Sequence, residues 1–252
     1  MNLFERIKIW IRVLTSYFLT FSGVKAPIYS AEDTVKVLLA GKSLIRFGDG
    51  EFGIYREKDI HYQEWSPELK EYFDKIKAEY EADSEHCNFL VAVPKRFMSI
   101  SGVQLAKKRV YVSCWSESRY DFKKNFRHDI PYGDSFLFEK NNWKIYSKLW
   151  KDEKCPSNVF FVHNLEQYAK LFADTYQKNT MFVQCPSQNA FTVVDDMEQK
   201  IEDIIQANNW NPKDVMLTIS AGPAGKVLVY KMSKKGYWCI DAGHCWDDPL
   251  ES

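Results

Sequence analysis

The sequence has no excess of charge of either sign and no paired cysteine motif. Its 34 Lys and Arg residues balance its 34 Asp and Glu residues, so net charge provides no general attraction to nucleic acid or to an anionic membrane. The six cysteines include no C-x-x-C pair, and most lie in or beside apolar segments. This usage is typical of reduced thiols in a cytoplasmic protein and argues against a disulfide framework or a zinc site.

The N-terminal segment, residues 1–29, also lacks the length of a membrane span. Its uncharged run, Val13–Val24, has only twelve residues, and no clean signal-peptidase site follows it. Apolar residues recur there at helical spacing, with basic residues among them. We expect an amphipathic helical appendage that packs on the domain or on a partner subunit, for example in a homodimer, with an interfacial membrane helix as the alternative. The predicted location is cytoplasmic, or membrane-associated through this helix.

Signatures of common nucleophilic and phosphoryl-transfer enzymes are missing as well. There is no P-loop G-x-x-x-x-G-K-[ST] and no G-x-S-x-G elbow. What is present from residue 30 onward is an alternation of helical patterns with short apolar runs. Such runs predict an α/β fold in one domain, residues 30–252, with a mostly parallel sheet and helices on both faces. The predicted strands are residues 43–47, 89–93, 110–114, 159–162, 181–185, 215–220 and 237–241, and the predicted helices are 31–40, 67–81, 165–176, 193–207 and 224–234.

One region interrupts this alternation. Residues 115–157 are dense in aromatic and charged side chains and show weak periodicity. We interpret them as an irregular, aromatic-rich insertion beside the sheet, helical near residues 143–150.

Two carboxylates follow the first predicted strand in the stretch SLIRFGDGEFGIY. Asp49 and Glu51 stand on either side of Gly50 in what we predict to be a loop at the carboxyl end of a buried strand, where open α/β sheets bind ligands. Oxygen ligands so placed suit Mg²⁺ or Mn²⁺, and such an ion could neutralise a diphosphate leaving group. The alternative is a solvated acidic turn, for which Gly-Asp-Gly is a common string.

A glycine-containing loop lies between the predicted strands 215–220 and 237–241. Gly222 and Pro223 precede a predicted helix, whose N-terminus favours a phosphate or pyrophosphate. Asp241 lies 19 residues after Gly222 (241 − 222), near the offset of the ribose-binding acid in dinucleotide folds. The loop lacks G-x-G-x-x-G, so NAD is not specified, and a purely structural turn is the alternative.

Polar residues follow two further strands. In VQCPSQNAF, Ser187 and Asn189 can contact a base or sugar, or can cap the next helix. His244, close to Asp241, is either a general base or a hydrogen-bonded residue at a strand end.

Three motifs occur in order: RFGDGEF, CPSQNAF and AGPAGKVLVYKMSKKGYWCIDAGH. Together they resemble the GT-D glycosyltransferases, a family that includes glucosyltransferases extending glycans on serine-rich streptococcal adhesins. The resemblance implies a Rossmann-like α/β fold, a nucleotide-sugar donor such as UDP-glucose and a glycan or glycoprotein acceptor. It also implies Mn²⁺ or Mg²⁺ at a D-x-E motif. The sequence departs from the family pattern after His244 and after residues 160–162, so donor sugar and acceptor can differ from those of the characterised member.

The resemblance also suggests roles for individual residues. It places the metal on Asp49 and Glu51, and the catalytic candidates are Asp49, Glu51, Asp241 and His244. The donor-binding residues that it implies are Arg46, Gly48, Gln63, Ser187, Asn189, Gly222 and Pro223. Two other functions stay open from sequence: a Rossmann enzyme that binds NAD or S-adenosylmethionine, and a non-catalytic subunit of a glycan-assembly complex.

Overall fold

A computed structural model describes residues 3–19, 21–107, 112–243 and 245–246, and these contain one seven-stranded sheet. Every strand pairs in parallel with its neighbours, in the order β3-β2-β1-β7-β6-β4-β5. The predicted α/β fold with a parallel sheet is therefore confirmed. The strands are β1 Ser43–Arg46, β2 Phe89–Val93, β3 Gly133–Asp134, β4 Asn158–His163, β5 Asn179–Gln184, β6 Val215–Ile219 and β7 Trp238–Asp241.

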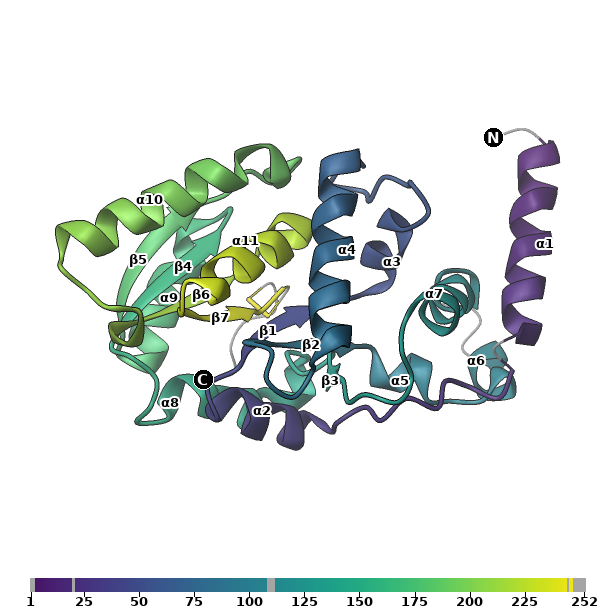
Figure 1. Cartoon of the computed structure of the whole chain (residues 1–252), viewed down its shortest axis with the longest axis horizontal. Helices are drawn as coiled ribbons and strands as arrows, with labels where there is room; N and C mark the ends of the chain where they lie inside the picture. The colour runs from purple at the N-terminus through teal and green to yellow at the C-terminus, as the bar shows by residue number, and fades with distance from the viewer. Residues whose placement is uncertain (1–2, 20, 108–111, 244, 247–252) are drawn as a thin grey trace.

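Helices cover both faces of this sheet (Figure 1). One face carries α4 (Pro67–Ala82), α10 (Val194–Ala207) and α11 (Gly222–Lys234), and the other carries α2 (Ala31–Leu39), α8 (Trp143–Lys151) and α9 (Glu166–Tyr176). Ser30 and Ser66 cap α2 and α4 through their hydroxyls, as their positions in the sequence predict. The remaining elements are α1 Leu3–Leu19, α3 Asp49–Ile54, α5 Lys95–Met98, α6 Gly102–Lys107, α7 Val112–Asn125 and the 3₁₀ turns η2 Lys140–Asn142, η3 Ala190–Val193 and η4 Pro212–Asp214.

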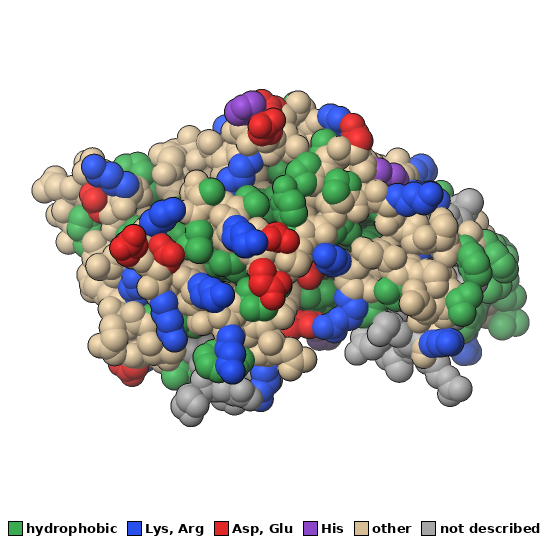
Figure 2. Space-filling view, turned by 90° about the horizontal axis from the view of Figure 1, so that it is seen from below, with side chains coloured by type: hydrophobic (Ala, Val, Ile, Leu, Met, Phe, Trp, Pro, Cys, Tyr) green, Lys and Arg blue, Asp and Glu red, His purple; other side chains and the backbone are tan. Residues whose placement is uncertain are grey.

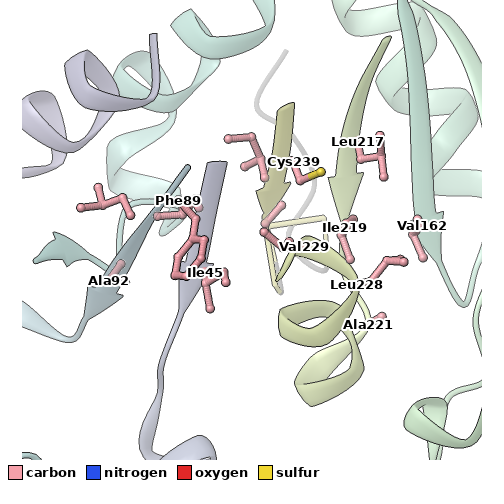
Figure 3. Packing of buried hydrophobic residues seen from close by; sticks show 14 of the residues in the cluster. Ile45, Phe89, Ala92, Val162, Leu217, Ile219, Ala221, Leu228, Val229 and Cys239 are labelled. Carbon is pink, nitrogen blue, oxygen red and sulfur yellow. The ribbon is translucent and has the colours of Figure 1, made fainter. Parts of the chain in front are cut away.

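The core lies between the central strands and these helices. Figure 3 shows side chains of α11, including Leu228 and Val229, directed at the strands β6 and β7. On the opposite face the fully buried Trp150 packs against Phe172 and Trp246, and its indole N–H donates to Thr218 Oγ1 at 3.1 Å. This bond satisfies the one polar atom of the side chain and anchors the aromatic insertion to β6.

Two predictions in the middle of the chain are wrong. Residues 112–114, predicted as the end of a strand, open the helix α7, because a short apolar run does not distinguish a strand from a buried helix. The sheet instead takes its edge strand from Gly133 and Asp134, which are too few to produce a periodic signal. The insertion is accordingly more helical than predicted, although the helix near residues 143–150 is confirmed.

The N-terminal helix α1 is present and contacts α7, but its apolar stripe faces solvent. We expected this helix to pack on the domain or on a partner subunit, and it does pack on α7, but the described residues of its apolar stripe are exposed. No described helix is both long and apolar enough to cross a membrane. The exposed stripe consists of Leu3, Phe4, Ile7, Trp10, Ile11, Leu14 and Phe18.

Candidate functional site

A pocket of about 1000 Å³ opens at the carboxyl ends of the strands. Its lining comes from the segments that follow β1, β4, β5, β6 and β7, together with residues 135–146 of the aromatic insertion. From β4 the chain moves outward to β5, whereas from β6 it moves in the opposite direction to β7. The connections therefore reverse between the neighbouring strands β4 and β6, and the segments that follow both strands line the pocket, at the switch point where open α/β sheets form their ligand crevice.

The two acidic residues of the D-G-E stretch lie in the first turn of α3, and the prediction that they occupy a loop is wrong. Asp49 is exposed at the pocket, whereas Glu51 is only 6% exposed. The Oε2 atom of Glu51 accepts a hydrogen bond from the Gly48 N–H at 2.8 Å, which satisfies a free amide at the start of the helix. The two carboxylates thus differ: Asp49 is accessible to a ligand, whereas Glu51 is buried and hydrogen-bonded within the protein.

Lys226 is a cation that pairs with two acidic residues of the site. We did not identify it from the sequence. It lies in the second turn of α11, is 3% exposed and lines the pocket. Its Nζ is 2.9 Å from Glu51 Oε1 and 3.2 Å from Asp241 Oδ2. A lone charge within the apolar segment AGKVLV was the available signal, because charged side chains are seldom fully buried unless they are paired.

Arg46 completes this cluster from the end of β1. Its backbone N–H donates to Asp241 Oδ2 at 3.1 Å, and its Nη1 donates to the Ser135 carbonyl at 2.9 Å. Within the described residues, Arg46 Nε and Asp241 Oδ1 lie 4.0 Å apart and neither has a hydrogen-bond partner. Two cations and two anions, drawn from β1, α3, α11 and β7, form a nearly neutral buried centre beside the exposed Asp49.

The protonation states of this centre follow from its contacts. Burial opposes ionisation of Glu51, but the Lys226 ammonium and the Gly48 N–H hold the pKa of this carboxyl below its ordinary value. Burial also opposes the charge of Lys226, yet the carboxylates of Asp241 and Glu51 raise the pKa of its ammonium above the ordinary value. Burial, with the nearby Glu51 carboxylate, raises the pKa of Tyr62 to about 12. At neutral pH the ion pairs are therefore charged and Tyr62 keeps its proton.

Two predicted donor-binding residues tie loops together. The side chain of Gln63 accepts from the Phe191 N–H and donates to the Glu64 carbonyl. The Asn189 side chain accepts from the Glu64 N–H at 2.8 Å and makes no cap bond to the helical turn that follows. Gln63 lines the pocket, and Asn189 is not among its lining residues. Both residues fix the loop that carries Tyr62.

The remaining predicted residues are placed as follows. Arg46, Gly48, Ser187 and Gly222 line the pocket. Gly222 has a φ of +53°, and Tyr62 lies against it. Pro223 is buried in the first turn of α11 and is not a lining residue. His244 lies outside the described residues.

The side chains available as ligands determine whether the protein can coordinate a metal ion here. Across the described ranges, no three His, Cys, Asp or Glu side chains are grouped to hold an ion. Both oxygens of Glu51 already contact the protein, so of the two acids in the D-G-E stretch Asp49 alone is open to the pocket. These residues therefore do not form a metal site from protein ligands alone.

Residues 44–248 match the family described as glycosyltransferase GT-D fold. A probable glycosyl transferase Gly of Streptococcus gordonii is 25% identical over 231 residues, which cover 86% of this chain and 32% of that protein. Glycosyltransferase GlyD of Streptococcus pneumoniae is 23% identical over 223 residues, covering 80% and 24% respectively. The chain thus spans a third or less of the length of these curated relatives.

Solved structures have the same fold. A structure of the highly conserved domain of unknown function 1792, described as a distinct glycosyltransferase fold, superposes with a TM-score of 0.70 at 20% identity, covering 94% of this chain and 83% of that one. A glycosyltransferase of the same domain type from Streptococcus sanguinis gives 0.64 at 22% identity, covering 88% and 82%.

Proposed function

Because the chain belongs to the GT-D glycosyltransferase family, we propose that it transfers a sugar from a nucleotide-diphosphate donor to a glycan or glycoprotein acceptor. The sugar is a hexose, with glucose from UDP-glucose as the first candidate. The observation that carries the proposal is the pocket at the switch point of the sheet, in which Arg46, Lys226 and the N-terminus of α11 meet. Of these groups the N-terminus of α11 offers partial positive charge where a diphosphate leaves, whereas Lys226 is paired with Glu51 and Asp241.

The donor diphosphate lies, in this proposal, against the start of α11. Free backbone N–H groups at a helix N-terminus attract phosphate, and the left-handed Gly222, which has no side chain of its own, begins this helix at the pocket. Ser220 Oγ has no hydrogen-bond partner among the described residues and lines the same wall. Glu51 and Asp241 serve as counterions, since both carboxylates contact the ammonium of Lys226. The general base that takes the proton from the acceptor stays a prediction, with His244 as the candidate.

Asp49 is the residue that would hold a Mn²⁺ or Mg²⁺ ion, because its carboxylate alone in the D-G-E stretch is open to the pocket. Such an ion, when bound with the donor, supplies further positive charge to the diphosphate. The protein's own part is to orient the phosphates between Asp49, Arg46 and the α11 terminus.

The test is a screen of nucleotide sugars for hydrolysis and transfer. The purified chain is incubated with each UDP-, GDP- or dTDP-sugar with Mn²⁺ or with a chelator, and released nucleotide is measured. We expect turnover of a UDP-hexose that the chelator reduces. Calorimetric binding of NAD or S-adenosylmethionine without binding of UDP would overturn the proposal in favour of another Rossmann enzyme. Binding of UDP-sugars with no turnover under any acceptor mixture would favour a non-catalytic glycan-assembly subunit.

The exposed stripe of α1 suits an anionic membrane surface. Figure 2 shows hydrophobic side chains gathered at the end of the molecule where α1 lies, with cationic side chains nearby. Trp10 and Phe18 are 64% and 69% exposed, and Arg6 and Lys8 are exposed on the same helix. Apolar residues with flanking cations are the composition of helices that lie in the bilayer interface. We propose that α1 brings the pocket to a membrane.

Vesicle flotation tests this contact. The chain should float with vesicles containing phosphatidylglycerol and less with neutral phosphatidylcholine vesicles. Trp10→Ser combined with Phe18→Ser should abolish flotation. A concentration-dependent dimer that these substitutions dissociate, with no flotation of the unmodified chain, would show instead that a second copy covers the stripe.

A further inference from the structure

The ammonium of Lys226 occupies the position that a metal ion would take between two carboxylates. Its Nζ contacts Glu51 Oε1 at 2.9 Å and Asp241 Oδ2 at 3.2 Å, and all three side chains are buried. The carboxylates come from α3 and β7, which are distant in sequence, so the lysine joins two separate parts of the pocket floor. A divalent ion held by both carboxylates would have to displace this ammonium.

Charge balance explains why a cation is needed here. Glu51 and Asp241 are buried at 6% and 0% exposure, and two ionised carboxylates sharing a buried centre repel each other. Arg46 reaches only Asp241, through its backbone N–H and from 4.0 Å through Nε. Lys226 is the described cation that contacts both acids.

We propose that Lys226 is a resident cation that takes the place of a metal ion between Glu51 and Asp241, leaving Asp49 as the only acid of the D-G-E stretch available to a divalent ion. In the free protein such an ion binds weakly, because one exposed carboxylate is a poor site without the phosphate oxygens of the donor. Lys226 acts as a positioning residue that sets the orientation of Glu51 and Asp241. The part played by the donor rests on the proposed function, whereas the occupancy of the site by Lys226 does not.

Binding of Mn²⁺ to the donor-free protein tests this assignment without any measurement of sugar transfer. Free Mn²⁺ is followed by electron paramagnetic resonance, and the melting temperature is recorded with and without Mn²⁺. We expect Lys226→Met to bind Mn²⁺ at least tenfold more tightly than the unmodified chain, because Glu51 and Asp241 then face each other with no cation between them. Its melting temperature should rise on adding Mn²⁺. Lys226→Arg should restore weak binding.

Lys234→Met is the matched control. Lys234 lies on the same helix but is half exposed and contacts a single carboxylate, Glu79, at 2.7 Å. Its removal should leave Mn²⁺ affinity unchanged. Unchanged affinity in a folded Lys226→Met variant would overturn the proposal.

A second pair of variants keeps the test decisive if Lys226→Met does not fold. Asp49→Asn should abolish the weak Mn²⁺ binding of the donor-free protein, because its carboxylate is the available ligand. Glu51→Gln should leave that binding unchanged. An equal loss of Mn²⁺ affinity in both variants would show that Glu51 is a metal ligand and that Lys226 does not take the place of the ion. Neither result depends on sugar transfer, so failure here and failure of the proposed function are distinguishable.

Discussion

Replacing Gly222 with Ala tests the link between backbone conformation and donor binding. Gly222 has a φ of +53°, in the left-handed region, and it opens α11 beside the pocket. A Cβ added there would lie 2.5 Å from Tyr62 Cε2 and 3.3 Å from Cδ2. The substitution therefore has two effects: it strains the backbone, and it displaces the Tyr62 ring.

The two costs can be separated. An alanine held in the left-handed region loses about 1–2 kcal/mol relative to glycine. Overpacking against a side chain that is held by its surroundings adds about 1–3 kcal/mol. Gly236→Ala supplies the first cost without the second, because its φ is +89° but its nearest neighbour, Pro212 Cβ, is 3.7 Å from the added Cβ. Gly222→Ala should thus lose about 2–5 kcal/mol and Gly236→Ala about 1–2 kcal/mol.

Urea denaturation of both variants and calorimetric titration with UDP provide the measurement. We expect UDP affinity to fall about tenfold in Gly222→Ala, which corresponds to about 1.4 kcal/mol, and to stay unchanged in Gly236→Ala. Equal loss of stability in the two variants would refute the steric conflict with Tyr62. Normal UDP affinity in a folded Gly222→Ala would refute the placement of the diphosphate at α11.

Four further predictions follow from the site and the core. Asp49→Asn should reduce sugar transfer at least 100-fold in a steady-state assay while shifting the melting temperature by about 1 °C or less, because the side chain is exposed. Glu51→Gln should reduce transfer as strongly and also lower the free energy of unfolding by about 1.5–3 kcal/mol in urea, since it weakens charged hydrogen bonds to Lys226 and the Gly48 N–H. Because folding lowers the pKa of Glu51, this residue should contribute stability above its ordinary pKa of 4.5, and the contribution should be lost as pH falls through the folded value. Because folding raises the pKa of Lys226, the contribution of Lys226 should be present below its ordinary pKa of 10.5 and be lost as pH rises through the folded value. Unfolding curves across both pH ranges check these signs. Trp150→Ala should cost about 3–5 kcal/mol in the same urea assay, and a loss below 1 kcal/mol would contradict its anchoring role.

Patterns confined to a few neighbouring residues predicted the fold well. Six of the predicted strands are present, because buried parallel strands produce short apolar runs between helical patterns. The same rule failed at residues 112–114, where an apolar run begins a helix, and at β3, whose two residues carry no period. The α1 stripe shows the limit of such patterns: helical spacing predicted the helix, but the spacing carries no information about what covers its apolar side.

The candidate site was only half visible from sequence. The positions of Asp49, Glu51, Gly222 and Asp241 at strand ends already implied that they meet at one edge of the sheet. The sequence did not predict that Asp49 and Glu51 lie in different environments, because we expected both acids in a loop. A helix start instead turns Glu51 inward to the Gly48 N–H and leaves Asp49 exposed.

By itself the sequence determined the parallel α/β architecture and the edge of the sheet at which the charged residues gather, since both follow from the order of strands and helices along the chain. Only the tertiary structure decided how those charges are paired. Lys226 lies 175 residues after Glu51 (226 − 51) and 15 before Asp241 (241 − 226), and its contact with both arises because β1 and β7 are neighbours in the sheet and α11 packs across them. Pairing of this kind depends on strand order and helix packing, which no local pattern of residues specifies.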